Sequence, residues 1–415
     1  MNNLIIHNAR VVTPLGKEAK KGASMADIHE VPHASIVIEN GNITYIGSKD
    51  SIPQIPAQKN YKVIDAKGNV ALPGFVDSHT HLIFGGFRPD EFEWRLKGDS
   101  YMSIMERGGG IQSTVNATKA SSSEELSKKA QWFLNRMSEM GVTTVEAKSG
   151  YGLDLETELR MLEVIAGLKE NVDQVVDLVP TFLGAHAIPP EFKSRTADYV
   201  EFIINEVLPK VKDKAKFCDV FCEKNVFELE DSRRLLKAAR EQGMDLKLHA
   251  DEIVTLGGGE LSAELKAVSA DHLLHVSDEG IKQMAASGVV ATLLPLTAFA
   301  LKEPYAPARK FIDAGCAVSL ATDLNPGSCF SGSIPLTIAL ACIYMNMTIE
   351  ETITALTLNG AAALGMADSI GSLEVGKRGD VIILGSDNYR VLPYYVGMNC
   401  VQTTIFAGRL VSSNP

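Results

Sequence analysis

The stretch PGFVDSHTHLIFGG, from Pro73 to Gly86, leads an apolar run into two histidines that are separated by a single threonine. Successive side chains of an extended strand point to opposite faces, so His79 and His81 project from the same side. Two imidazoles that converge on one point suit a metal ion; the alternative is a pair of solvated histidines in a loop after a strand. The motif alone does not decide between these interpretations, so any further ligands must come from elsewhere in the chain.

The residues before this stretch alternate between apolar and polar in the manner of β-strands. Their runs are NLIIHNARVV, ASIVIENGNITYIGS and YKVIDA, and Asn40-Gly41 between two alternating runs predicts a tight hairpin turn. The end of the chain has the same character in GSLEVGKRGDVIIL and CVQTTIFAGRLV. We therefore predict that residues 1–66 and 368–415 meet in one small composite β-sandwich domain.

Residues 67–367 have a different pattern, in which short apolar runs are followed by amphipathic helical stretches such as LETELRMLEVIAGLKE and DSRRLLKAAREQG. The eight runs are NVALPGFVD, GVTTVEAKS, QVVDLVPTFLGAH, KFCDVFCE, DLKLHADE, SADHLLHV, GVVATLLPL and CAVSLATD. Strand–helix units in this number predict an α/β fold, a parallel (β/α)8 TIM barrel. In such barrels the catalytic residues come from the C-terminal ends of the strands.

Composition restricts the possible partners. The chain has 415 residues, of which 45% are hydrophobic, and a formal net charge of -11. An acidic chain without a long Lys/Arg run is a poor ligand for nucleic acid or an anionic membrane. The N-terminal residues lack the pattern of an export signal and no 18-residue apolar segment occurs, so we expect a cytoplasmic protein. Six cysteines in a chain of this length do not indicate a disulfide framework.

Polar residues gather at the ends of the predicted barrel strands. His79 and His81 follow the first run, His249 closes the fifth and Asp323 closes the eighth. Three imidazoles and one carboxylate suit a single Zn²⁺ or Fe²⁺ ion with room for a water molecule. Such an ion lowers the pKa of its water from 15.7 toward about 7, which indicates hydrolysis. Asp323 can accept the water's proton, and Glu252 can protonate a leaving nitrogen unless it is merely a solvated or helix-capping acid.

The HTH after FVD, together with LHADE, DHLLH and ATDLNPGS, resembles the amidohydrolase superfamily over the whole chain. Four further segments, FGGFRPDEF, RGGGIQST, KSGYGL and FLGAH, are most similar to the members that act in histidine degradation. Those members open the ring of 4-imidazolone-5-propanoate with water and give N-formimidoyl-L-glutamate. The resemblance therefore implies this small-molecule substrate, and it also implies a homodimer.

The same resemblance assigns roles around the metal. Arg88 is expected to bind the substrate's propionate, because a planar guanidinium makes a two-pronged contact with a carboxylate. His272 is expected to polarise the carbonyl oxygen or to steady the attacking water. The other residues that the resemblance places at the substrate are Tyr151, His186, Glu252, Asn325, Gly327 and Ser328, with Tyr101 as a weaker candidate.

Three alternatives remain open at this point. A deaminase of a cyclic nitrogenous base would use the same metal ligands, although a neutral base needs no Arg88. A dinuclear cyclic-amide hydrolase usually carries a carboxylated lysine at the end of the fourth strand, where this chain has Glu223. A scaffold protein of the same architecture would have lost ligands, whereas every proposed ligand is present here.

Overall fold

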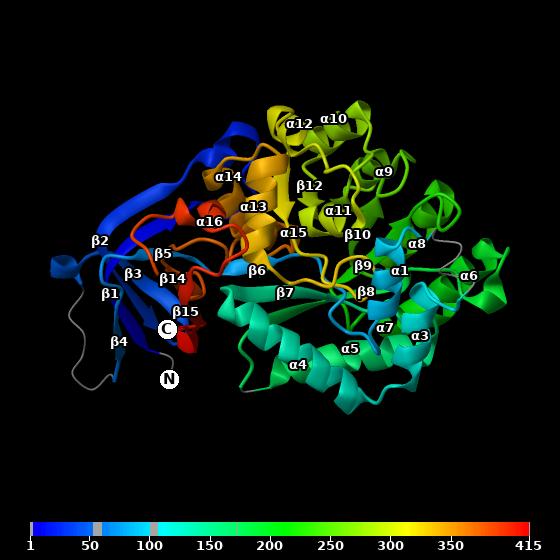
Figure 1. Ribbon diagram of the computed structural model, residues 1–415, viewed down its shortest axis with the longest axis horizontal. Coiled ribbons are helices and arrows are strands. Elements are labelled where there is room, and N and C mark those ends of the chain that lie inside the picture. The colour runs from blue at the N-terminus through cyan, green and yellow to red at the C-terminus, as the bar shows by residue number, and fades with distance from the viewer. Residues whose placement is uncertain (1–2, 53–59, 100–106, 172, 415) are drawn as a thin grey trace.

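The computed structural model describes residues 3–52, 60–99, 107–171 and 173–414. Within these residues the strands form two separate sheets, and the smaller sheet lies beside the barrel (Figure 1). The predicted arrangement, an eight-stranded parallel barrel beside a small sheet built from both termini, is confirmed. None of the described helices is long and apolar enough to cross a membrane.

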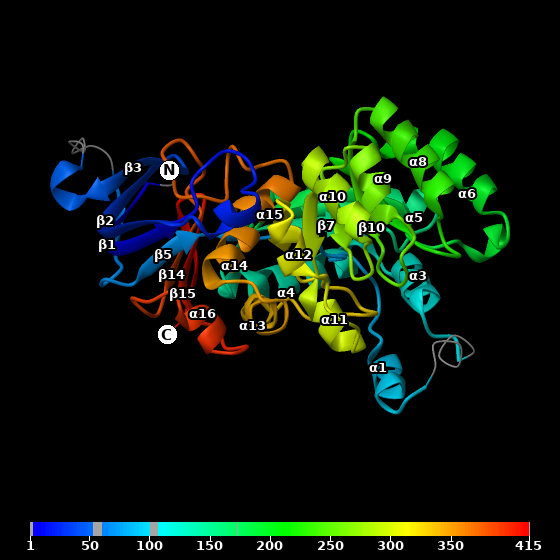
Figure 2. The same cartoon turned by 90° about the horizontal axis from the view of Figure 1, so that it is seen from above.

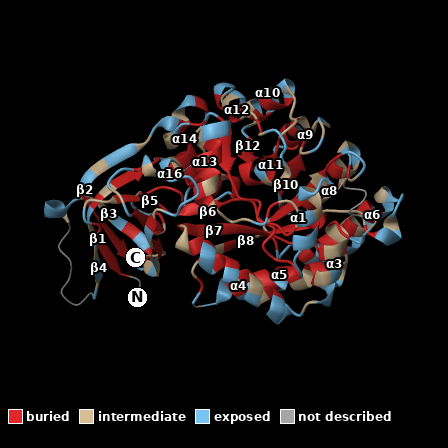
Figure 3. Cartoon of the chain, in the orientation of Figure 1, coloured by how far each residue is buried: buried red, intermediate tan, exposed pale blue. Residues whose placement is uncertain are grey.

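The barrel strands follow one another in chain order and are all parallel. Each of the predicted apolar runs supplies one strand of the barrel. They are β6 (Phe75–Asp77), β7 (Val142–Lys148), β8 (Asp177–Ala185), β9 (Phe217–Cys222), β10 (Asp245–Ala250), β11 (Ser269–His272), β12 (Val290–Leu293) and β13 (Ala317–Leu320). These strands are buried, as the red arrows at the centre of Figure 3 show.

Helices surround the barrel and bury one apolar face each. Figure 2 shows them from above. They include α3 (Ile111–Ala120), α4 (Ser123–Glu139), α5 (Leu155–Glu170), α6 (Thr196–Phe202), α7 (Leu208–Val211), α8 (Leu229–Glu241), α9 (Gly258–Glu264), α10 (Asp278–Ser287), α11 (Pro295–Leu301), α12 (Ala308–Asp313), α13 (Ile334–Tyr344), α14 (Ile349–Leu356) and α15 (Leu358–Ala363). The helix start at α5 is fixed by Asp154, whose carboxylate accepts the Thr157 N–H at 2.8 Å.

The small sheet is mixed, and its strands come from both ends of the chain. The strands are β1 (Leu4–Thr13), β2 (His29–Glu39), β3 (Asn42–Ser48), β4 (Lys62–Asp65), β5 (Val70–Pro73), β14 (Val381–Leu384), β15 (Val401–Phe406) and β16 (Arg409–Ser413). The predicted hairpin turn joins β2 to β3, and both Asn40 and Gly41 have positive φ, at 50° and 85°. A short helix, α16 (Val391–Tyr394), lies between β14 and β15.

One apolar run, NVALPGFVD, serves both sheets. β5 pairs with β1 and β14 in the small sheet, and β6 pairs with β7 in the barrel. Gly74 lies between them, and a Cβ there would approach the Thr143 hydroxyl to 2.3 Å, so only glycine lets the chain pass. The division into residues 1–66 with 368–415 and residues 67–367 stays a prediction, although β5 joins the small sheet by its hydrogen bonds.

Candidate metal centre and substrate site

The barrel closes at the predicted ligands themselves. Beyond the last residue of β6, the His81 N–H donates to the Leu324 carbonyl at 2.9 Å, and the Asp323 N–H donates to the His79 carbonyl at 3.0 Å. Thr80 and Leu324 form a parallel bridge between these two segments. The first and last strands therefore meet where the HTH and ATD motifs lie, which brings ligands far apart in sequence to one place.

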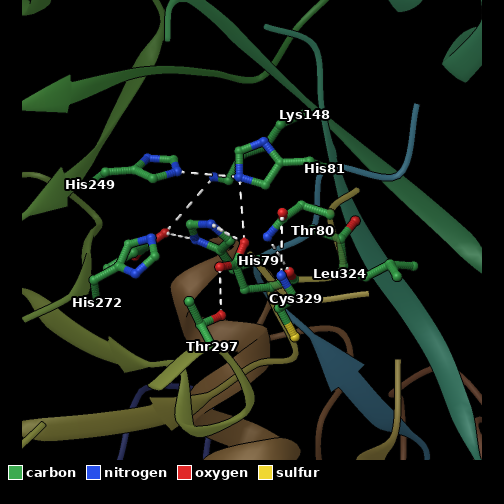
Figure 4. A network of polar contacts seen from close by, with 12 residues as sticks. His79, Thr80, His81, Lys148, His249, His272, Thr297, Leu324 and Cys329 are labelled. Carbon is green, nitrogen blue, oxygen red and sulfur yellow. Dashed lines mark hydrogen bonds and ion pairs between the residues drawn. The ribbon is translucent and has the colours of Figure 1, made fainter. Parts of the chain in front are cut away.

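Four of the predicted ligand atoms face one another in the buried centre (Figure 4). The Oδ1 atom of Asp323 lies 3.4 Å from His79 Nε2 and 3.5 Å from His81 Nε2. His249 Nε2 lies 3.3 Å from His81 Nε2. Three nitrogens and one oxygen so arranged can hold a metal ion, and His79, His81 and Asp323 together form a group with metal-ligand spacing.

Two carboxylates fix the orientation of two of these imidazoles. Asp271 Oδ2 lies 2.6 Å from His79 Nδ1, and Asp219 Oδ2 lies 3.0 Å from His249 Nδ1. A carboxylate beside Nδ1 favours the proton on that atom and leaves the lone pair on Nε2. Both Nε2 atoms therefore point into the centre as acceptors, the form that a metal ion requires.

A hydrogen bond fixes the Asp323 carboxylate through one of its two oxygens. Thr297, near the start of α11, donates its hydroxyl to Asp323 Oδ2 at 2.7 Å. Oδ1 has no hydrogen-bond partner among the described residues, although it is buried. Burial raises the pKa of Asp323 to about 6, while the Thr297 hydrogen bond acts in the opposite direction. Oδ1 is thus left free to bind an ion.

The electrostatics of two of the histidines fit the same interpretation, whereas the pKa of His249 is raised, because the neighbouring Asp219 outweighs the lowering effect of burial. Burial, with Lys148 nearby, lowers the pKa of His79 well below its ordinary value, and burial likewise lowers the pKa of His81. These two imidazoles are therefore neutral at physiological pH. His79 Nε2 is buried and lacks a hydrogen-bond partner among the described residues. A buried polar atom without a partner is costly unless a ligand satisfies it.

His272 and Glu252 lie beside the ligand cluster. His272 Nδ1 lies 3.6 Å from Glu252 Oε1, and the His272 ring centroid lies 5.3 Å from that of His79. Burial and the neighbouring Asp323 raise the pKa of Glu252 to about 8, so this carboxyl group keeps its proton at neutral pH. His272 has a positive φ of 76°, a conformation that is uncommon for residues other than glycine.

A buried charge network lies among the barrel strands next to the centre. Lys148 Nζ lies 2.9 Å from Glu146 and 2.7 Å from Asp219, and Lys247 Nζ lies 3.4 Å from Glu146 and 3.7 Å from Asp271. All of these side chains are fully buried. The two ammonium groups therefore neutralise the carboxylates that orient His79 and His249, and they are themselves the cations of this network.

Tyr151 and His186 form an aromatic wall next to His81. The His186 ring stacks on His81 with centroids 4.9 Å apart, and Tyr151 lies 5.1 Å from His186. His186 Nδ1 contacts the Gly150 carbonyl at 3.0 Å, and burial lowers the pKa of His186 to about 3. Burial also raises the pKa of Tyr151, so both side chains are neutral hydrogen-bonding groups.

The loop after β13 is organised by its own amide. Asn325 Oδ1 accepts the N–H groups of Gly327 at 2.8 Å and Ser328 at 2.7 Å, and its Nδ2 donates to the Asp323 carbonyl at 2.8 Å. The Asn325 side chain is therefore already bonded to its own loop. Arg88 lies against this loop, because a Cβ on Gly327 would be 2.5 Å from Arg88 Nη1.

Two further sequence predictions need separate comment. Tyr101 lies outside the described residues. Glu223 is buried, and its carboxylate accepts the N–H groups of Lys224 at 2.8 Å and Ile253 at 2.8 Å. Among the described residues Glu223 belongs to no group with metal-ligand spacing.

Sequence reasoning missed the residues that hold the ligands in place: Asp219, Asp271 and Thr297. A signal existed for the two acids, since each lies inside an apolar run where a charged residue is rarely buried without a partner. No signal existed for Thr297, because a threonine in an apolar segment is ordinary.

The comparisons with known proteins agree with this geometry. The model of the amidohydrolase family matches residues 70–411. Barrel, composite sheet and histidine–aspartate cluster together define the class, and the chain belongs to the amidohydrolase family.

Within that family the close relatives are imidazolonepropionases. The chain is 63% identical to that of Phocaeicola vulgatus over 100% of both chains. It is 55% identical to that of Clostridium tetani, over 99% of this chain and 98% of the relative. The chain belongs to this branch, and the resemblance predicted from its motifs is confirmed.

Solved structures share the fold at low sequence identity. The 5-methylcytosine deaminase from Klebsiella pneumoniae gives a TM-score of 0.75 at 17% identity, covering 99% of this chain and 98% of that one. The guanine deaminase of E. coli gives 0.70 at 15% identity, covering 100% and 99%. These likenesses support the architecture alone.

Proposed function

We propose that the protein opens the five-membered ring of 4-imidazolone-5-propanoate with water and releases N-formimidoyl-L-glutamate. This is hydrolysis of a carbon–nitrogen bond in a cyclic amide. The full-length identity to imidazolonepropionases supports the proposal. The observation that carries it is the convergence of three imidazole nitrogens and one carboxylate oxygen at the point where the barrel closes.

His79, His81, His249 and Asp323 would hold one divalent cation, Zn²⁺ or Fe²⁺. The residues fit such an ion, because the Nδ1 atoms of His79 and His249 face carboxylates and Asp323 Oδ1 has no hydrogen-bond partner among the described residues. When bound, the metal supplies a water molecule acidic enough to yield hydroxide near neutral pH.

The chain's own groups would move the protons. Asp323, fixed through Oδ2 by Thr297, would accept the proton of the attacking water on its carboxylate. Glu252 carries a proton at neutral pH and donates it to the ring nitrogen that leaves. His272, which is neutral because burial lowers its pKa, donates an N–H to the carbonyl oxygen or to the water.

The substrate's two ends would meet different groups. Tyr151 and His186 line the ring, with Glu252 on the side of the leaving nitrogen. Arg88 binds the propionate, next to the loop of Asn325, Gly327 and Ser328. Tyr101 is retained as a weaker proposal for the same pocket. A homodimer and a cytoplasmic location complete the proposal.

The direct test follows the absorbance of the imidazolone ring after metal-loaded protein is added. We expect the absorbance to fall and N-formimidoyl-L-glutamate to appear. Protein freed of metal and the Asp323→Asn variant should both be nearly inactive. Elemental analysis should give one metal per chain.

Two results would contradict the proposal. Ammonia release from a purine or pyrimidine, with no action on the imidazolone, would identify a deaminase. Two tightly held metals per chain, with the second lost in a Glu223→Gln variant, would identify a dinuclear centre.

A further inference from the structure

The guanidinium of Arg88 is already paired along one edge. Its Nε donates to Glu91 Oε1 at 2.9 Å, and its Nη2 donates to Glu91 Oε2 at 2.6 Å. Helix α1 (Pro89–Leu96) begins at the residue after Arg88, and Glu91 lies in its first turn. One of the two edges through which the guanidinium can make a two-pronged contact is thus occupied by a carboxylate of the chain itself.

Glu91 is itself fixed in this position. Its Oε1 also accepts the Gly110 N–H at 3.0 Å, and the residue is 8% exposed. Helix α1 is tied to the last loop as well, because Arg95 donates to the Gly327 carbonyl at 2.8 Å. Moving Glu91 away from Arg88 would therefore break contacts to two segments and leave a largely buried carboxylate without its charge partner.

The third nitrogen of Arg88 is directed elsewhere. Nη1 has no hydrogen-bond partner among the described residues. It lies against Gly327, where an added Cβ would approach it to 2.5 Å. Arg88 is also near enough to Tyr151 to act on the pKa of that hydroxyl. The unpaired edge of the guanidinium therefore faces the loop that lies beside the proposed substrate site.

We propose that Glu91 is a positioning residue that sets how the substrate's carboxylate is read. By holding Nε and one N–H of Nη2, it directs the free end of the guanidinium, which is Nη1 and the second N–H of Nη2, toward the propionate next to Gly327. The substrate carboxylate then binds to the end of a charge-neutral Arg–Glu pair whose orientation Glu91 fixes, and not to the edge that Glu91 occupies. This inference rests on the proposed function, and it adds a residue that controls specificity within it.

The test separates kcat from KM on two substrates, the propionate compound and an analogue with an ethyl group in its place. In Glu91→Ala the Arg88 charge remains but its orientation is lost. We expect kcat on the propionate substrate to fall by on the order of 10- to 100-fold, because a misplaced anchor misplaces the ring. We expect KM to change by less than about threefold.

Matched variants complete the experiment. The amide of Glu91→Gln can accept only one of the two Arg88 N–H groups, from Nε or from Nη2. The kcat of this variant should therefore lie between that of wild type and that of Glu91→Ala. Arg88→Met should instead raise KM for the propionate substrate. Glu93→Ala is the control, because Glu93 is an exposed acid of the same helix that pairs with Lys97. All Glu91 variants should act on the ethyl analogue like wild type.

Three outcomes would overturn the proposal. Equal losses on both substrates would mean that Glu91 only supports the fold. Unchanged or improved kcat on the propionate substrate in Glu91→Ala would mean that Glu91 is idle or competes with substrate for Arg88. A wild-type protein that is metal-loaded yet inactive on the propionate substrate would remove the proposed function, and the positioning role with it.

Discussion

Glu252 lies where a carboxylic acid keeps its proton. Its side chain is 16% exposed, its Oε1 lies 3.6 Å from His272 Nδ1, and burial raises its pKa to about 8. A group that must protonate a leaving nitrogen at neutral pH needs such a pKa. The raised pKa also determines the pH dependence. Glu252 can donate a proton below about pH 8, and activity that depends on this proton falls as the pH rises through that value.

We expect Glu252→Gln to keep its metal and to lose about 10²- to 10⁴-fold in kcat, the range for a general acid–base group. The wild-type rate should fall on the alkaline side near pH 8, and the residual rate of the variant should lack that fall. Elemental analysis and a pH profile of kcat measure both. Loss of metal in the variant would make Glu252 a ligand, and a near-normal rate would remove it from the mechanism.

At this scale the sequence predicted some residues and not others for a physical reason. The convergence of His79, His81, His249 and Asp323 could be predicted because each follows or ends an apolar run, and parallel strand ends meet at one rim. The pairing of Arg88 with Glu91 could not be found. Three residues apart, the two suit one face of a helix, but whether the pair turns inward depends on tertiary packing.

Helix α11 contributes to the centre through a single hydroxyl. Thr297 holds Asp323 Oδ2 at 2.7 Å, which leaves Oδ1 as the atom that would bind the proposed metal. We expect Thr297→Val to weaken metal affinity by about 10- to 100-fold, since groups that orient ligands have effects of this size. Thr297→Ser keeps the hydroxyl and should bind almost like wild type. Competition with a chromophoric chelator measures both, and a Thr297→Val variant with wild-type affinity would contradict the role.

Helices whose apolar residues recur at helical spacing could be predicted from the sequence. An apolar run that supplies strands to two different sheets could not. The helical stretch LETELRMLEVIAGLKE coincides with α5 (Leu155–Glu170), because its apolar positions and its Asp154 cap agree. The run NVALPGFVD gave no indication that β5 and β6 enter different sheets. Both halves are apolar, and the change at Gly74 is set by contact with Thr143, which is distant in sequence.

The proposed metal would connect parts of the whole barrel. Its ligands follow β6, lie in β10 and follow β13, so the ion would hold strands from both ends of the barrel sheet. A ligand that binds only the folded state stabilises it, by about 2.7 kcal/mol at a concentration of 100 times Kd. We expect chelation to lower the Tm of the wild-type protein in calorimetry. The Asp323→Asn variant should have a lower Tm before chelation, and chelation should change that Tm less. A wild-type Tm that chelation leaves unchanged would contradict this prediction.

The place of β5 between β1 and β14 has a consequence for the newly made chain on the ribosome. β5 is synthesised early, but its antiparallel neighbour Val381–Leu384 emerges on the order of tens of seconds later at ordinary translation speeds. During that interval one edge of an apolar strand has no partner, and such an edge invites pairing with other chains. The edge of β5 therefore stays open to such pairing until its last partner strand has left the exit tunnel.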